Sequence, residues 1–437
     1  MEIRIISREM IKPSSPTPDH RRTHKLSLLD QLAPDNYFTT ILYYSQAYNK
    51  NTSETSDHLK KSLSKTLTHY YPLAGRVKDD FSIDCDDYGV AFIEANIASY
   101  MSDVLKLSEV IDLLEQLLPC AANPQKLSVD DTIVGVQVNY FECGGIALGF
   151  CFRHSILDAT AAANFVKSWA KVACGGDDDI KDVIFDYTSI FPPQDLSDLS
   201  KGIYKENYAP SSEDSITKMF MFDGKKVAAL KEKISNGPCL DRPPTRFEAV
   251  TALIWGAVIA AKRETTAIND FTSPRHVAKV SVNLQKRMNP PIPQCCVGNI
   301  YQVTFVNYPV EKTIDYNSLA GRIHESIAMM NDLYARKLNG GGGFLNYLKN
   351  LAEKRSNKVN VYGFSGWCKL PFYEADFGWG KPLRVSTAMR LNNFAVLLDS
   401  SDGEGIDAWV GLSKQDMAKF QQDPNIITYA SFSPTKL

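Results

Sequence analysis

Hydrophobic and polar residues follow two patterns along this chain, one typical of strands and one typical of helices. Apolar positions at helical spacing predict helices over 56–70, 159–174, 224–235, 246–262 and 317–336. Short apolar or alternating runs predict strands over 81–85, 90–94, 133–141, 145–152, 218–222, 277–284 and 300–306. Strands that alternate with helices in this way predict an α/β fold with mixed sheets.

The pattern breaks between residues 190 and 215. This stretch contains Phe191-Pro-Pro-Gln-Asp195, repeated serine and aspartate, and Ala209-Pro-Ser-Ser-Glu-Asp214, a composition typical of a loop. A chain of 437 residues is also long enough for more than one domain. We therefore predict an N-terminal domain over 1–190, a crossover linker over 191–215 and a C-terminal domain over 216–437.

The longest nearly apolar run in the sequence covers residues 249–261. Residues 249–261 are too few to span about 30 Å of hydrocarbon. The preceding Thr245-Arg-Phe-Glu248 matches a capping box, so the run is predicted to belong to a buried core helix. The N-terminal residues carry charges and lack the apolar core of a signal peptide, so we expect a cytoplasmic protein.

Charge and cysteine content exclude several classes of function. The chain has 48 Lys and Arg against 50 Asp and Glu, a net charge of −2, which gives no attraction toward nucleic acid or an anionic membrane. Its nine cysteines show no metal-ligand spacing, so we expect reduced thiols, no metal and no permanently bound cofactor. We expect a monomer whose partners are small molecules.

Two stretches carry candidate chemistry. His154-Ser-Ile-Leu-Asp158 lies between a predicted strand and a predicted helix, where catalytic groups of α/β folds are common, although a structural histidine remains the alternative on this spacing alone. Asp376-Phe377-Gly378-Trp379-Gly380 is a rarer string. Its glycines and aromatic rings indicate a tight turn held by buried rings, with Asp376 accepting hydrogen bonds, and it offers neither a nucleophile nor a general base.

Together with Tyr71-Pro-Leu-Ala-Gly-Arg76, these motifs make the chain resemble the plant BAHD acyltransferases over nearly its whole length. Smaller details, including Arg287-Met-Asn-Pro-Pro291, are most similar to the branch that acetylates alkaloids. The resemblance implies two similar-sized mixed-sheet domains of the chloramphenicol acetyltransferase type, with a channel between them. It also implies acetyl transfer from acetyl-CoA, as co-substrate, to a hydroxyl of an alkaloid or related metabolite.

The resemblance also assigns roles to residues. His154 is the general base, because a neutral imidazole can take the proton of an attacking alcohol. Asp158 orients the histidine loop, and the oxyanion candidates are Ser365, Trp367 and Asn299. The sequence departs from the family at Gln285, in Asn283-Leu-Gln-Lys-Arg287, where relatives carry the arginine that pairs with the aspartate.

Two other interpretations stay open at this point. One is a catalytically silent relative that binds a small molecule or a partner, which Gln285 favours and the intact His154 opposes. The other is a hydrolase that uses Cys143 or Cys151 with His154. Both cysteines lie in apolar strand sequence, where a thiol is usually an inert packing group.

Overall fold

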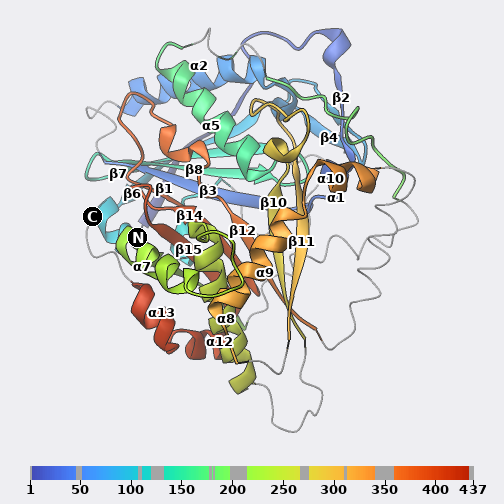
Figure 1. Ribbon diagram of the computed structural model, residues 1–437. Helices are drawn as coiled ribbons and strands as arrows, with labels where there is room; N and C mark the ends of the chain where they lie inside the picture. Colours follow the sequence, from blue (N-terminus) through green and yellow to red (C-terminus); the bar gives the residue numbers. More distant parts are fainter. Residues whose placement is uncertain are drawn as a thin grey trace. The chain divides into compact units, whose positions relative to one another are not determined.

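The chain forms two compact units, and the predicted α/β fold with two mixed-sheet domains is confirmed (Figure 1). A computed structural model describes residues 2–45, 52–106, 111–119, 132–176, 180, 183–196, 214–265, 275–309, 313–339 and 359–432. The first unit comprises residues 1–207, 293–300 and 369–389, and the second comprises 208–292, 301–368 and 390–437. The predicted linker over 191–215 stays a prediction, because residues 197–213 lie outside the described part of the chain.

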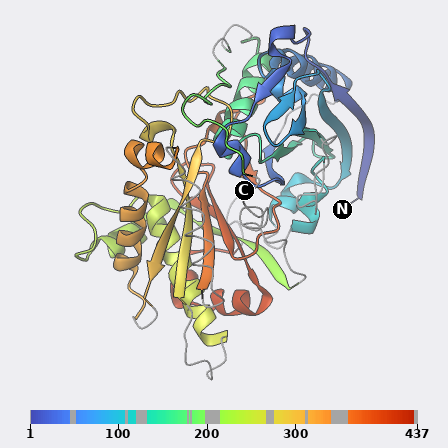
Figure 2. The ribbon, with the colours of Figure 1, turned by 90° about the vertical axis from the view of Figure 1, so that its right-hand side faces the viewer.

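A six-stranded sheet forms the base of the first unit. Its order is β1 (Glu2–Ile11), β6 (Val90–Ala98), β7 (Val134–Phe141), β8 (Ile146–Arg153), β3 (Tyr37–Tyr44) and β13 (Arg384–Ser386). Only β6 and β7 run parallel, and Figure 2 shows β1, in dark blue, along an outer edge. Every residue of β3, β7 and β8 is buried, so these strands read as continuous apolar runs in the sequence.

Helices cover this sheet, and a small second sheet completes the unit. Helices α2 (Thr52–His69) and α5 (Ala159–Ala173) lie side by side (Figure 1), and the Trp169 indole nitrogen donates to Ser62 Oγ across 3.0 Å. The shorter helices are α1 (Leu28–Leu32), α3 (Met101–Leu105) and α4 (Ile111–Glu115), with the 3₁₀ turns η1 (Asp19–Arg21), η2 (Tyr71–Ala74) and η5 (Pro371–Glu374). The small sheet has the order β2 (Thr23–Lys25), β5 (Ser82–Asp84) and β4 (Arg76–Asp79).

The second unit has its own six-stranded mixed sheet. Its order is β11 (Tyr301–Tyr308), β10 (Arg275–Asn283), β12 (Val359–Gly366), β14 (Phe394–Asp399), β15 (Ile406–Ser413) and β9 (Ser215–Phe222), with β10, β12 and β14 parallel. Its helices are α7 (Gly224–Ser235), α8 (Arg246–Thr265), α9 (Tyr316–Ala328), α10 (Asp332–Asn339), α12 (Lys414–Phe420) and α13 (Pro424–Tyr429), and η4 spans Gln285–Arg287. Alternate residues of β10 and β15, such as Val280 and Val410, join the apolar residues of α8 in one core.

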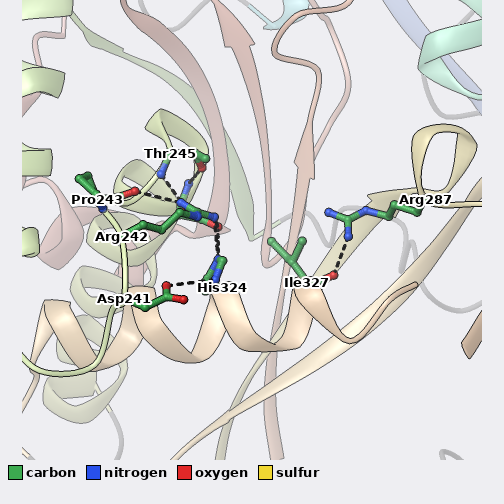
Figure 3. Close-up of polar contacts among 8 residues, drawn as sticks. Asp241, Arg242, Pro243, Thr245, Arg287, His324 and Ile327 are labelled. Atoms are coloured by element: carbon green, nitrogen blue, oxygen red, sulfur yellow. Dashed lines mark hydrogen bonds and ion pairs between the residues drawn. The ribbon is translucent and has the colours of Figure 1, made fainter. Parts of the chain in front are cut away.

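The capping box predicted before α8 is present (Figure 3). The Thr245 N–H donates to Glu248 Oε2 across 2.7 Å, and the Glu248 N–H donates to Thr245 Oγ1 across 3.2 Å. Burial would raise the pKa of Glu248, but hydrogen bonds from Arg242, Thr245 and His324 outweigh it and lower that pKa. Figure 3 also shows Arg287, which donates to the Ile327 carbonyl at the end of α9.

The helix predicted over 317–336 is divided into α9 and α10. The division falls at Asn331, whose Oδ1 accepts from the Tyr334 N–H and whose carbonyl accepts from the Ala335 N–H. Asparagine favours such a cap over a helix interior, so the apolar periodicity concealed a new helix start. Among the described helices, none is long and apolar enough to cross a membrane.

Candidate active site

His154 occupies the loop that leaves β8 and enters α5. Its N–H donates to the Asn36 carbonyl across 2.8 Å, and its own carbonyl accepts from Asn299 Nδ2, also across 2.8 Å. The imidazole packs edge-on against Phe38, with the ring centroids 5.0 Å apart, and the residue is partly exposed. The main chain of His154 is therefore held from both sides, and the residue as a whole stays partly exposed.

The neighbours of His154 anchor the same loop. Arg153 and Ser155 both donate to Asp35 Oδ1, at 3.0 Å from Arg153 Nε and 3.1 Å from Ser155 Oγ. The Leu157 N–H donates to the Arg153 carbonyl and closes a turn directly after the strand. Arg153 is buried, so this charge-assisted contact is shielded from water and holds the loop more firmly than an exposed ion pair would.

Asp158 ends the histidine loop and begins the helix that follows it. It is the N-cap of α5: its Oδ1 accepts from the Ala161 N–H across 2.9 Å. Its Oδ2 accepts from the Ile300 N–H across 3.1 Å, which ties α5 to the segment 293–300. Burial raises the pKa of Asp158 to about 6, and backbone N–H groups are the largest opposing influence. Main-chain donors thus supply the stabilisation that the family resemblance assigned to an arginine.

Asn299 lies beside Asp158 and is fully buried. Its side-chain amide has two hydrogens, and both are donated within the protein, to Asp30 Oδ1 across 3.1 Å and to the His154 carbonyl across 2.8 Å. This geometry leaves the amide no hydrogen for a substrate oxyanion. The oxyanion role expected of Asn299 stays a prediction, and the contact that the structure shows is the hydrogen bond to the carbonyl of His154.

Ser365 and Trp367 belong to the second unit, whereas His154, Asp158 and Asn299 belong to the first. Ser365 is a partly exposed residue of β12, and its register neighbour on β14 is Val396. Trp367 follows the strand, is 6% exposed, and donates its main-chain N–H to the Leu397 carbonyl across 2.8 Å. Gln285 opens η4 in the same unit and is buried.

The segment Asp376 to Gly380 forms a tight turn in the first unit. Asp376 Oδ1 accepts from the N–H groups of Gly378 and Gly380, at 2.8 and 2.9 Å, and both glycines have positive φ. Phe377 is 3% exposed and meets Trp169 edge to face, with centroids 4.9 Å apart. The carboxylate itself is exposed, so the buried ring and the turn account for the motif.

Sequence analysis missed Asp30 and Tyr187. Asp30 is a buried residue of α1 that contacts Asn299, and the Tyr187 hydroxyl lies 2.9 Å from both of its carboxylate oxygens. A local signal for Asp30 was available, because Ser27-Leu-Leu-Asp30 has the spacing of a capping box, which the structure forms. No local pattern marks Tyr187.

The alternative of a cysteine nucleophile does not fit the first unit. Cys151 is disulfide-bonded, so the expectation of reduced thiols is wrong at this residue, while the other described cysteines are free. Cys143 lies in the turn before β8, whereas His154 follows the last residue of that strand. Eight strand residues at about 3.4 Å each separate them by roughly 27 Å, far beyond hydrogen-bond reach.

A family model described as the Transferase family matches residues 1–427. The chain belongs to this family, the BAHD acyltransferases. It is 51% identical to limonoid 1-O-acetyltransferase from Citrus sinensis, over 99% of each chain, and 36% identical to vinorine synthase from Rauvolfia serpentina, over 94% of each. The crystal structure of vinorine synthase matches with a TM-score of 0.84 at 33% identity, covering 99% of both chains. This BAHD protein is therefore an acyltransferase with an acyl-CoA as its co-substrate.

Proposed function

We propose that this BAHD enzyme transfers an acetyl group from acetyl-CoA to a hydroxyl of a polycyclic plant metabolite, with His154 as the general base. The observation that carries the proposal is the placement of His154. Its main-chain N–H and carbonyl both form hydrogen bonds, its ring packs against Phe38, and the residue as a whole is partly exposed. A general base needs this combination of a fixed origin and a ring that a substrate can reach.

The chemistry follows from the imidazole. Neutral His154 takes the proton of the acceptor hydroxyl as the oxygen attacks the thioester carbonyl, and a tetrahedral oxyanion forms. The imidazolium then returns that proton to the departing CoA thiolate, which releases the acetyl ester and free CoA thiol. A positioned base contributes about 10²- to 10⁴-fold in rate, so substrate positioning and oxyanion donors must supply the rest.

The oxyanion donor in this proposal is the Ser365 hydroxyl, with the Trp367 indole as a second candidate. A hydroxyl is suited to the role because it donates one hydrogen and can rotate to follow the developing charge. Removing a single oxyanion donor costs about 10²- to 10³-fold in kcat in well-studied hydrolases. Ser365→Ala should therefore lower kcat and leave KM for acetyl-CoA nearly unchanged, as steady-state kinetics would show.

The choice of acceptor rests on the relatives. The chain shares 51% identity with a limonoid acetyltransferase and 36% with vinorine synthase. Limonoid alcohols are therefore the first acceptors to test, and alkaloid alcohols the second. We also predict a cytoplasmic monomer, for which light scattering should return about the chain mass of 48.7 kDa.

The deciding experiment follows thiol release from acetyl-CoA with each acceptor, together with ester formation by mass spectrometry. His154→Ala should lower kcat by at least about 10²-fold, the low end of general-base effects. His20→Ala is the matched control, because His20 is an exposed histidine of the same unit, and it should leave kcat unchanged. Near-normal turnover by a folded His154→Ala protein would contradict the assignment.

A further inference from the structure

Asp30 is a buried carboxylate at the start of α1, 3% exposed. Five hydrogen-bond donors converge on it: the N–H and hydroxyl of Ser27, the hydroxyl of Tyr187, and the N–H and side-chain amide of Asn299. Burial raises the pKa of Asp30, and these donors oppose that shift. A helix cap needs only the Ser27 contacts, so the donors from Tyr187 and Asn299 serve another purpose.

The contact with Asn299 leads directly to the histidine. Asn299 Nδ2 lies between two acceptors, Asp30 Oδ1 at 3.1 Å and the His154 carbonyl at 2.8 Å. Because neither acceptor can face the amide oxygen, the Asp30 carboxylate and the His154 carbonyl together determine which way the amide points. Asn299 Oδ1 is buried and has no hydrogen-bond partner among the described residues. The orientation of the amide therefore satisfies the two hydrogen bonds that Nδ2 donates, and leaves Oδ1 without one from the described residues.

Two successive main-chain N–H groups complete the arrangement. The Asn299 N–H donates to Asp30 across 2.8 Å, and the Ile300 N–H donates to Asp158 across 3.1 Å. The segment that carries them is also tied to Ile184, whose carbonyl accepts from the Val297 N–H across 2.8 Å. The two carboxylates therefore hold one short segment, which in turn holds the carbonyl of His154.

We propose that Asp30 is a positioning residue of the acyl transfer, acting on His154 through the amide of Asn299. This inference rests on the proposed role of His154 as the base. Asp158 fixes the position where the histidine loop ends by capping α5, whereas Asp30 fixes the position of the main-chain carbonyl of His154. Displacement of a catalytic group by about 1 Å can lower a rate by about 10²-fold.

The test compares Asp30→Asn with two other variants. In Asp30→Asn the new amide has only one acceptor oxygen, so it cannot satisfy the donors from Ser27, Tyr187 and Asn299 together. We expect kcat to fall about 10- to 100-fold, with KM for acetyl-CoA changed by less than about threefold. Asn299→Ala should show the same loss, and the double variant should lose no more than either single one. Glu94→Gln is the matched control, because Glu94 is another buried carboxylate of the first unit that accepts from Ser7 and Tyr140, and it should retain kcat within about threefold.

A background that lacks the base separates positioning from a general structural effect. When His154 is alanine, Asp30→Asn should cause no further loss in the residual rate, because Asp30 acts only through the histidine. A further loss of tenfold or more there, or normal kcat in both Asp30→Asn and Asn299→Ala, would overturn the inference. If Asp30→Asn does not fold, Asn299→Ala carries the test, since it keeps the Asp30 carboxylate and four of its five donors. Normal kcat in His154→Ala alone would instead contradict the proposed function.

Discussion

The turn from Asp376 to Gly380 allows a prediction about which of its residues stabilises the fold. The Phe377 ring is 3% exposed, meets Trp169 at 4.9 Å and stacks on Trp379 at 5.5 Å between centroids. The Asp376 carboxylate is exposed and accepts two hydrogen bonds from the turn. We therefore predict that Phe377→Ala destabilises the first unit more than Asp376→Ala does.

The magnitudes follow from burial. Phe377→Ala removes a buried aromatic ring and leaves a cavity, which costs about 3–5 kcal/mol. Asp376→Ala removes two hydrogen bonds at about 0.5–1 kcal/mol each, since water can replace an exposed acceptor. For a unit of about 200 residues, 1 kcal/mol shifts Tm by about 2–4 °C, so the first substitution should lower Tm by at least 6 °C and the second by less.

The assay is thermal unfolding followed by circular dichroism, with initial rates measured on the same samples. Phe81→Ala serves as the matched control, because this phenylalanine of the same unit is 44% exposed, and it should shift Tm by less than about 2 °C. If Asp376→Ala lowered Tm as much as Phe377→Ala, the argument from ring burial would be refuted. An Asp376→Ala protein with normal Tm and lost activity would assign the carboxylate a direct part in the reaction.

Two further predictions concern other buried positions. Burial, together with Arg263 and Lys262, lowers the pKa of His276 from 6.5 to about 4; its stabilising effect is therefore complete above pH 6.5 and is lost as pH falls toward 4. Between pH 7 and pH 4.5 the free energy of unfolding, followed through Tm, should fall by about 2–3 kcal/mol less in His276→Gln than in the unchanged protein. An equal fall in both proteins would contradict the argument. At Gly298, where φ is +145°, an added Cβ would lie 1.5 Å from the Tyr187 hydroxyl. Gly298→Ala should destabilise by at least 2 kcal/mol, whereas Gly144→Ala, with positive φ but open space, should cost about 1–2 kcal/mol; equal effects in denaturant titration would show that Tyr187 moves freely.

Local signals were enough to predict part of the fold, but β1, β12, β14 and β15 were not among the predicted elements. The capping box at Thr245 and Glu248, the strand 145–152 and the helix 159–174 all depend on residues close in sequence. The division at Asn331 was missed because a single cap residue does not alter the apolar period around it.

The candidate site could be predicted only in part. His154 and Asp158 are four positions apart, so their loop leaves a readable motif. The contact between Asp30 and Asn299 joins residues 269 positions apart. No periodicity or spacing encodes such a pairing, because its geometry depends on how distant strands and loops pack.

The first unit is built from segments that are far apart in the sequence, and this affects how it folds during synthesis. The hydroxyls of Thr39 on β3 and Thr387, just after β13, lie 3.3 Å apart although 348 positions separate them. At about 5–20 residues per second, a ribosome adds Thr387 about 17–70 s after Thr39. Once β8 has been added, β3 can pair with β8 on one side but still lacks β13 on the other. The nascent chain therefore presents an open apolar sheet edge until β13, in about the last eighth of the protein, has been added.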